Sequence, residues 1–326
     1  MSRIYDVITI GEATIDAFMT IHDSSEKISL DTKTGELCFR HGEKINVEKY
    51  DFQMGGNAAN VAVGLTRLGL NAAPACEIGD DEFSIKIRNQ MALEGVERVL
   101  VTQSKGRQSN FSVIINFKGD RTIFNEDLKR EHIFDFDDLA AKYIYLTSMG
   151  EEWVGAYEHA LEFGGKHGSK IVFNPGTHQL SGQSVVINKI LKSTDILFVN
   201  KEEAELLLFK HFNKKLDNSD HYIKNLCMEL QQLGPKIVVI TNGKEGSSCL
   251  DEKGNYTIQD LFPGKVVERT GAGDSFAAGF LGATIYGFDI ETAMRWGAIN
   301  SASVVGQVGA EPGLLTKEEI EEKFKE

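Results

Sequence analysis

The sequence predicts an α/β protein with a mostly parallel, doubly wound sheet. Short apolar, β-branched runs alternate with helical patterns over most of the 326 residues. The runs are apolar almost throughout, which is typical of strands covered by helices on both faces. The chain has 32 glycines but only 5 prolines. We therefore interpret the glycines as residues of turns and close backbone contacts and not as part of disordered sequence. No internal repeat or linker divides the chain, and we expect one domain over residues 1–326.

The core strands and helices can be placed one after another along the chain. We expect strands at 6–11, 71–77, 142–146, 170–174, 195–199 and 236–241. We expect helices at 57–68, 82–94, 152–167, 183–192, 201–209 and 220–233. Because strand and helix alternate in this order, a helix can connect one parallel strand to the next across a face of the sheet.

Two regions interrupt this alternation and predict a small β-sheet lid. Residues 16–54 carry few helical signals, many turn formers and short alternating runs. Residues 107–125 also alternate, and Gly119 and Asp120 separate two apolar runs as the turn of a hairpin would. We expect both inserts to form antiparallel strands that lie over the core.

Composition argues against several classes of partner. Lys and Arg number 35 against 48 Asp and Glu, and the net charge of −13 disfavours nonspecific binding to nucleic acid or anionic membranes. The apolar run 7–10 is too short for a signal peptide, and no stretch reaches the ~20 apolar residues of a membrane helix. We therefore expect a cytoplasmic protein. Its four cysteines are far apart and form no C-x-x-C pair: Cys38, Cys76, Cys227 and Cys249.

The chemistry is concentrated in one strand–turn–helix segment. Val266 and Val267 suggest a strand end that runs into Thr270–Asp274, and a helix of small and apolar residues follows as far as Gly287. Glycines directly before a helix let backbone N–H groups converge on one point, where the helix dipole also favours negative charge. This arrangement predicts an anion pocket suited to a phosphate. The residues that would form it are Gly271, Ala272 and Gly273.

Asp274 lies in the first turn of this helix and has two interpretations. A carboxylate there can simply cap the helix, but it would repel a phosphate in the same pocket. It can instead face a substrate hydroxyl and accept its proton as the oxygen attacks phosphorus. The glycine N–H groups would then stabilise the charge on the transferring phosphoryl group.

Other nucleotide-binding motifs do not occur in the sequence. A Walker A motif needs Gly-Lys followed by Ser or Thr, but the Gly-Lys pairs are followed by His167, Glu245 and Val266. The dinucleotide fingerprint should follow the first strand, where residues 11–16 read Gly-Glu-Ala-Thr-Ile-Asp. These mismatches disfavour a dehydrogenase. No H-E-x-x-H occurs, and the eight histidines are scattered.

Two signatures resemble those of the ribokinase-like carbohydrate kinases, the PfkB family. Thr270–Phe276 (Thr-Gly-Ala-Gly-Asp-Ser-Phe) is similar to the C-terminal signature, and Gly55–Gly69 (Gly-Gly-Asn-Ala-Ala-Asn-Val-Ala, then Leu-Thr-Arg-Leu-Gly) to the N-terminal one. Shorter matches follow in family order over nearly the whole chain, at 11–16, 79–83, 200–203, 241–246 and 309–312. The resemblance implies a three-layer ribokinase-like core with a β-sheet lid. It also implies an ATP-dependent kinase acting on a hydroxymethyl group of a sugar or nucleoside.

The resemblance implies that Asp274 is the general base and the glycine segment before it the anion hole. Asp16 lies just past the first strand, where open α/β sheets bind ligands, and a carboxylate there can accept two sugar hydroxyls. As an alternative it is only a turn acid, and Gly56 with Asn57 only a helix start. The substrate-binding residues that the resemblance implies are Asp16, Gly55, Gly56 and Asn60.

On the nucleotide side the resemblance implies Mg²⁺ organised near the phosphates by Asn200 and Glu203. Their spacing aims both side chains to one side, although Glu203 can equally belong to a solvated helix face. The segment from Thr241 to Gly246 is by itself a hairpin turn, and in the family it lies along the nucleotide. The remaining nucleotide-binding residues implied are Thr241, Gly243, Gly246 and Asn300.

The chain also departs from the family pattern. Glu268 and Arg269 stand where Asp-Thr is usual, and Gly313 where Ser is frequent. These positions surround the monovalent-cation site of potassium-activated members, so the K⁺ requirement is left open. Ala298 aligns where some relatives carry Asn, while Asn300 is two residues further on, which leaves the adenine contacts undefined.

The first interpretation is an ATP:sugar phosphotransferase of ribokinase or fructokinase type. The alternatives are a nucleoside kinase of the same family and a non-catalytic sugar-binding regulator. A lid sheet would expose Phe111, Val113 and Ile115 on one face, which predicts a homodimer through the lids.

Overall fold

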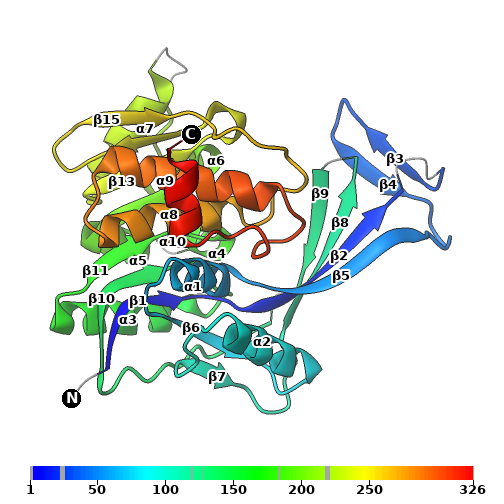
Figure 1. Ribbon diagram of the computed structural model, residues 1–326, viewed down its shortest axis with the longest axis horizontal. Coiled ribbons are helices and arrows are strands. Elements are labelled where there is room, and N and C mark those ends of the chain that lie inside the picture. The colour runs from blue at the N-terminus through cyan, green and yellow to red at the C-terminus, as the bar shows by residue number, and fades with distance from the viewer. Residues whose placement is uncertain are drawn as a thin grey trace.

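The computed structural model describes residues 3–22, 26–118, 120–126, 128–182, 184–216 and 221–325, with backbone alone at 120 and 184. Within these residues the core is a nine-stranded sheet in the order β15-β14-β13-β12-β11-β10-β1-β6-β7 (Figure 1). In chain order its strands are β1 Arg3–Ile10, β6 Ala72–Ile78, β7 Val101–Gln103, β10 Leu139–Leu146, β11 Lys170–Phe173, β12 Thr194–Asn200, β13 Ile237–Thr241, β14 Ser247–Leu250 and β15 Tyr256–Gln259.

The central strands run parallel, and only the edge formed by β14 and β15 is antiparallel. The mostly parallel doubly wound sheet is therefore confirmed. All six predicted core strands are present, with ends that differ by at most a few residues. The first residues of two predicted helices, 183 and 220, lie outside the described residues.

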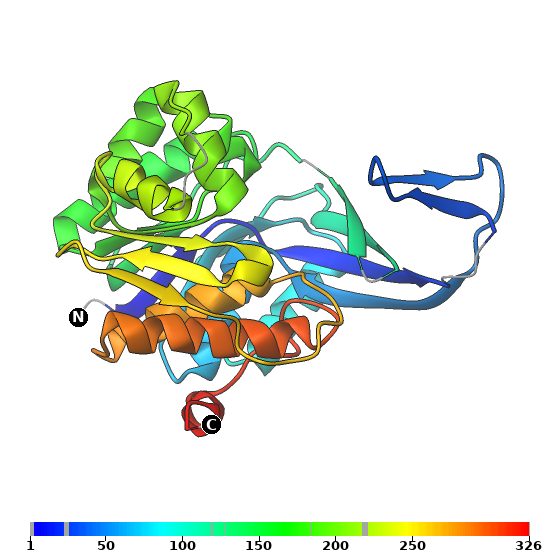
Figure 2. The same cartoon turned by 90° about the horizontal axis from the view of Figure 1, so that it is seen from above.

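Helices cover both faces of the sheet and make the molecule three layers deep (Figure 2). On one face lie α1 Asn57–Arg67, α2 Glu82–Leu93, α8 Ala272–Ile285, α9 Ile290–Val305 and α10 Lys317–Lys323. On the other lie α3 Trp153–His167, α4 Thr177–Leu180, α5 Ser184–Ser193, α6 Lys201–Phe212 and α7 Tyr222–Gln231. Successive side chains of β1 enter different layers, since Val7 packs with the first set and Ile8 with the second. None of the described helices is long and apolar enough to cross a membrane.

A second, smaller sheet extends from the core in the order β5-β2-β8-β9 (Figure 1). Its strands are β2 Thr14–Ile21, β5 Val47–Gly55, β8 Asn110–Phe117 and β9 Asp120–Asn125, and a separate hairpin pairs β3 Ile28–Asp31 with β4 Glu36–Phe39. This is the lid, and β8 with β9 is the predicted hairpin; its Gly119 lies outside the described residues. The expectation of antiparallel strands throughout is wrong at one ladder, because β2 and β8 pair parallel. Both strands leave the core in the same direction, so they cannot pair otherwise.

Two further expectations need correction. Val266 and Val267 belong to no strand, and their side chains are exposed. They lie in the segment between β15 and α8, and Val267 N donates to Val305 O of α9 at 2.7 Å and not to a neighbouring strand. Phe111 is half-buried rather than exposed, because its ring stacks on Phe83 of α2 with centroids 5.2 Å apart. Val113 and Ile115 are also half-buried.

Candidate active site

Asp274 is directed toward α1 and does not cap its own helix. Gly271 is the N-cap of α8, with φ 77°, and no side chain caps that end. The Asp274 carboxylate instead accepts hydrogen bonds from Asn57 Nδ2 at 2.9 Å and from Asn60 Nδ2 at 2.8 Å. Of the two interpretations of Asp274, the capping one therefore does not describe this structure. Sequence reasoning missed Asn57 as a partner because its place at a helix start already explained it.

The glycines of both signatures allow backbone segments to approach closely. A Cβ on Gly271 would lie 2.5 Å from Ala310 Cβ, and Gly271 also has a positive φ. A Cβ on Gly55 would lie 2.2 Å from Asp16 Oδ2, and one on Gly56 would lie 2.5 Å from Glu12 O. The fold thus brings the start of α1, the end of β5 and Asp16 together. It also brings the start of α8 beside them, through the bonds of Asp274 to α1.

Asp16 and Asp274 are both buried carboxyl groups with raised pKa values. Burial raises the pKa of Asp274 to about 6, although the hydrogen bonds from Asn60 and Asn57 act in the opposite direction. Burial also raises the pKa of Asp16 to about 6, opposed by Thr14 and Ser112. A carboxylate with a pKa near the working pH is a better proton acceptor than an ordinary aspartate.

A polar row crosses the lid on the face that carries Asp16. In strand register Gln53, Asp16, Ser112 and Asn125 lie side by side. Thr14 Oγ1 donates to Asp16 Oδ1 at 3.0 Å, and Ser112 Oγ donates to Asn125 Oδ1 at 2.9 Å. Ser112, Asn125 and Gln53 were not among the residues expected from the sequence. Their period-2 placement in alternating lid strands was the available signal, but the register between the strands was not.

Two buried acceptors in this region have no hydrogen-bond partner in the described structure. They are Asn60 Oδ1 and Gln53 Oε1. A buried polar atom without a partner carries an energetic penalty unless a ligand or water satisfies it. Both atoms are therefore suited to receive hydroxyl groups of a substrate.

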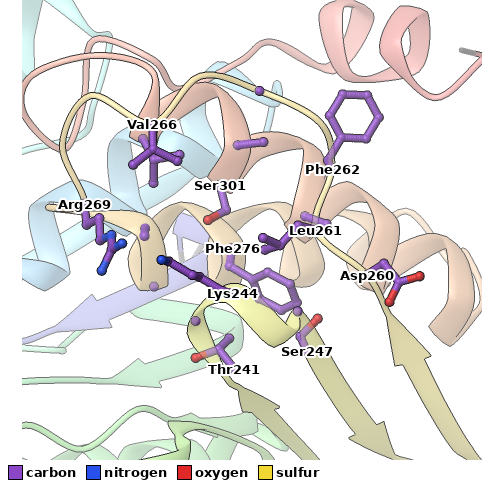
Figure 3. A pocket seen from close by; sticks show the side chains of 18 residues that line it. Thr241, Lys244, Ser247, Asp260, Leu261, Phe262, Val266, Arg269, Phe276 and Ser301 are labelled. Carbon is purple, nitrogen blue, oxygen red and sulfur yellow. The ribbon is translucent and has the colours of Figure 1, made fainter. Parts of the chain in front are cut away.

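A cavity of about 260 Å³ lies between η1 (Gly243–Glu245) and the helices α8 and α9 (Figure 3). Positive φ values at Gly243 (53°) and Gly246 (79°) allow the turn that closes one side, and β13 and β14 pair across it as a hairpin. Apolar side chains line much of the cavity, and Lys244 and Arg269 contribute positive charge to its lining (Figure 3). The residues expected from the sequence that line it are Thr241, Gly243, Gly246, Ala272 and Gly273.

The structure does not bring Asn300 to this cavity. Asn300 is fully buried, its Nδ2 donates to Ser275 O at 2.8 Å, and its Oδ1 accepts from Leu315 N at 3.0 Å. Its amide joins α8 to the C-terminal loop and has a structural role. From the same helix, Ala298 and Ser301 line the cavity instead.

Asn200 and Glu203 form a reciprocal capping box at the start of α6. Asn200 Oδ1 accepts from Glu203 N, and Glu203 Oε2 accepts from Asn200 N, both at 2.8 Å. Burial raises the pKa of Glu203, so it is not an ordinary solvated helix-face residue. Within the described part of the chain, no three His, Cys, Asp or Glu side chains gather to hold a metal. A carboxylate oxygen of Glu203 fits Mg²⁺ only as one ligand beside phosphate oxygens and water.

The comparisons with known proteins identify the class. The model of the pfkB family carbohydrate kinases matches residues 10–317. An uncharacterized sugar kinase of Archaeoglobus fulgidus is 31% identical and aligns over 77% of this chain and 98% of its own. The chain belongs to the pfkB family and is an ATP-dependent carbohydrate kinase. A 5-dehydro-2-deoxygluconokinase of Bacillus subtilis is 24% identical over 98% of this chain and 96% of its own length.

Solved structures show the same fold. The ribokinase of Arabidopsis thaliana, complexed with ribose and ATP, superposes with a TM-score of 0.78 at 21% identity, covering all of both chains. A nucleoside kinase of Burkholderia thailandensis, in complex with inosine, gives 0.75 at 19% identity over 98% of this chain and 97% of its own. The ribokinase-like core with its lid is therefore confirmed.

Proposed function

We propose that this kinase transfers the γ-phosphoryl group of ATP to a hydroxymethyl group of a sugar, with Asp274 as general base. The observation that carries the proposal is the placement of Asp274. Its buried carboxylate, held by Asn57 and Asn60, lies one residue from the glycine segment that begins α8. In this proposal the proton acceptor lies beside the N–H groups that begin α8, as phosphoryl transfer requires.

In the reaction, Asp274 accepts the proton of the substrate hydroxyl as its oxygen attacks the γ-phosphorus. The bond from that phosphorus to the bridging oxygen breaks, and ADP leaves. Backbone N–H groups of Gly271 and Gly273 stabilise the charge on the transferring group. The N–H of Ala272 between them donates to Arg269 O at 3.3 Å, and it joins them only when it leaves that carbonyl for the phosphoryl group. Lys244 and Arg269 add positive charge along the phosphates, since both line the nucleotide cavity. The proton on Asp274 then returns to solvent.

Mg²⁺ supplies charge neutralisation at the β- and γ-phosphates when bound. Glu203 would be its protein ligand, and Asn200 holds Glu203 in place through the capping box. We propose that K⁺ is not required. The Glu268 carboxylate already accepts hydrogen bonds from Thr270 N and Oγ1 and pairs with Arg121, which leaves less charge for a cation. Kinase assays in K⁺, Na⁺ and tetramethylammonium salts should give equal rates, and strong K⁺ activation would contradict this.

The substrate class we propose is a neutral, polyhydroxylated sugar. Hydroxyl groups are the donors that suit the acceptors in this region, which are the Asp16 carboxylate and the unpartnered Asn60 Oδ1 and Gln53 Oε1. A sugar acid such as the substrate named in 5-dehydro-2-deoxygluconokinase would place a carboxylate among these acceptors. A nucleoside is the second candidate, supported by the fold of nucleoside kinases.

We further propose that the lid segments, about 16–54 and 107–125, close over the sugar within a single kinase domain of residues 1–326. Closure would exclude water, which otherwise competes for the phosphoryl group. The free cysteines, of which Cys76, Cys227 and Cys249 are buried, support a reducing cytoplasmic setting.

The test is a substrate panel with coupled detection of ADP. Pentoses, hexoses, nucleosides and 5-dehydro-2-deoxygluconate are offered with Mg-ATP, with EDTA as the control. Mg²⁺-dependent phosphorylation of a neutral sugar supports the proposal. Turnover of the sugar acid alone would overturn the substrate class, and full activity without divalent metal would overturn the mechanism.

A further inference from the structure

An ion pair joins the lid to the segment that begins the anion hole. Arg121 on β9 places Nε 3.4 Å from Glu268 Oε1, and the Glu268 side chain is only 5% exposed. The same Oε1 accepts from Thr270 N and from Thr270 Oγ1, each at 2.7 Å. Thr270 is bonded directly to Gly271. One carboxylate thus touches both the lid and the residue before the anion hole.

A second lid contact reaches the neighbouring core loop. Gln53 Nε2, on β5, donates to Val308 O at 3.1 Å, and Gly309 N donates to Glu268 Oε2 at 3.5 Å. Opposite edges of the lid therefore meet two core segments that Glu268 itself connects. A cavity of about 170 Å³ lies at this junction, and its lining includes Asn116, Arg121, Glu268, Arg269 and Val308.

The negative charge of Glu268 at this junction affects the transfer of a negatively charged phosphoryl group. With the lid closed, Arg121 offsets the negative charge of Glu268. With the lid open, Glu268 loses that partner, and its negative charge lies two residues before Thr270 and the α8 N-terminus, where a negatively charged phosphoryl group must pass. Burial is the main cause of the raised pKa of Asp16, and the charge of Glu268 adds to it, so Glu268 also affects the substrate side of the site. Like charges in a poorly solvated site repel strongly.

We infer that Arg121 is a positioning residue that couples lid closure to phosphoryl transfer by neutralising Glu268 next to the anion hole. The inference rests on the proposed role of the α8 N-terminus in binding the transferring group. It concerns a residue that contacts Glu268 and not the reacting atoms. When substrate binding closes the lid, Arg121 reaches Glu268 and offsets its charge. When the lid is open, the charge of Glu268 disfavours the phosphoryl group at the anion hole.

The experiment begins with Arg121→Met, Arg121→Lys and the control Lys49→Met. Lys49 is an exposed cation on β5 in the same cross-strand row as Arg121, and strands β2 and β8 lie between the two. Arg121→Met should lower kcat at least about tenfold while the Kd for ATP stays within about twofold of wild type. Arg121→Lys should restore most of kcat, and Lys49→Met should behave as wild type.

A double variant separates charge from packing. Glu268→Gln keeps an oxygen that can accept from Thr270 but removes the charge. In the Arg121→Met background it should raise kcat back to within about threefold of Glu268→Gln alone. If Arg121→Met retains more than half of wild-type kcat, or if Glu268→Gln gives no recovery, the inference is wrong while the proposed function stands. If the wild type phosphorylates no sugar or nucleoside in the panel, the proposed function fails and the inference fails with it.

Discussion

At the scale of single residues, the placement of Asp274 has the largest consequence. The Asp274 carboxylate is buried and does not cap its helix, so its negative charge does not stabilise that helix end through a capping bond. Its hydrogen bonds come from two asparagine amides, which orient it without neutralising it. The site thus keeps a proton acceptor at an energetic cost to the fold, as many active sites do.

Asp274→Asn should lower turnover by about 10²–10⁴-fold, because the amide cannot accept the proton. The same change should raise the free energy of unfolding at pH 7, since it removes a buried charge. Asn60 can flip its amide to suit the new side chain because its Oδ1 has no other partner. Coupled ADP release and urea unfolding measure the two effects. A variant that keeps more than a tenth of wild-type turnover would exclude the general-base role.

The pH dependence follows from two carboxyl groups whose pKa values are about 6 in the folded protein. Protonation of Asp274 removes the base, so kcat/KM should fall as pH decreases below about 6. The free energy of unfolding should change in the opposite direction to kcat/KM. A raised pKa means that the folded state binds protons more tightly, so unfolding free energy should increase as pH falls from 7 toward 5. The Asp16→Asn variant should lose part of that stability change, and a profile flat between pH 5 and 7 in both quantities would contradict the assignment.

At the scale of elements, the start of α6 combines a structural and a functional use of one side chain. Glu203 closes the capping box with Asn200 and is also the proposed Mg²⁺ ligand. Gln at this position can still close a capping box, whereas Ala cannot.

Glu203→Gln should therefore leave the melting temperature nearly unchanged but raise the Mg²⁺ concentration needed for half-maximal rate. Glu203→Ala should also raise the Mg²⁺ concentration needed for half-maximal rate. In addition it should lower the free energy of unfolding by about 1 kcal/mol, because the cap is lost. Metal titrations and thermal unfolding of the two variants provide the measurement. Equal Mg²⁺ dependence in wild type and Glu203→Gln would show that Glu203 only caps the helix.

At the scale of the whole molecule, the lid carries its apolar residues on the face opposite Asp16. Tyr50, Phe52 and Phe124 alternate with the polar row, and their exposed fractions are 69%, 37% and 53%. Such a face in an extended sheet is suited to pairing with a second copy of the chain. This is a different set of residues from the one expected on the sequence alone, since Phe111 stacks on α2.

Phe124→Glu should convert a lid-mediated homodimer to a monomer, because it places a charge in the buried contact. Ile258→Glu is the matched control, since Ile258 is 62% exposed on β15 at the edge of the main sheet. Light scattering over a dilution series distinguishes the two. A wild-type protein that is monomeric at every concentration would contradict the predicted lid-mediated homodimer.

The sequence by itself determined the fold class, the order of the core elements and the two glycine signatures. These features are encoded locally, in apolar periodicity and in residues a few positions apart. The glycine turn that begins α8 at Gly271 could be predicted for this reason, and so could the position of Asp16 past the first strand.

The tertiary structure alone decided where the side chains point. Asp274 meets Asn60 across 214 positions of the chain, and Arg121 meets Glu268 from a separate sheet. No short-range pattern encodes such pairs, because they depend on how whole layers pack and on the register between strands. Asn300 was expected at the nucleotide, but its amide forms hydrogen bonds to Ser275 and Leu315. These partners also depend on the packing of whole elements and could not be read from the sequence.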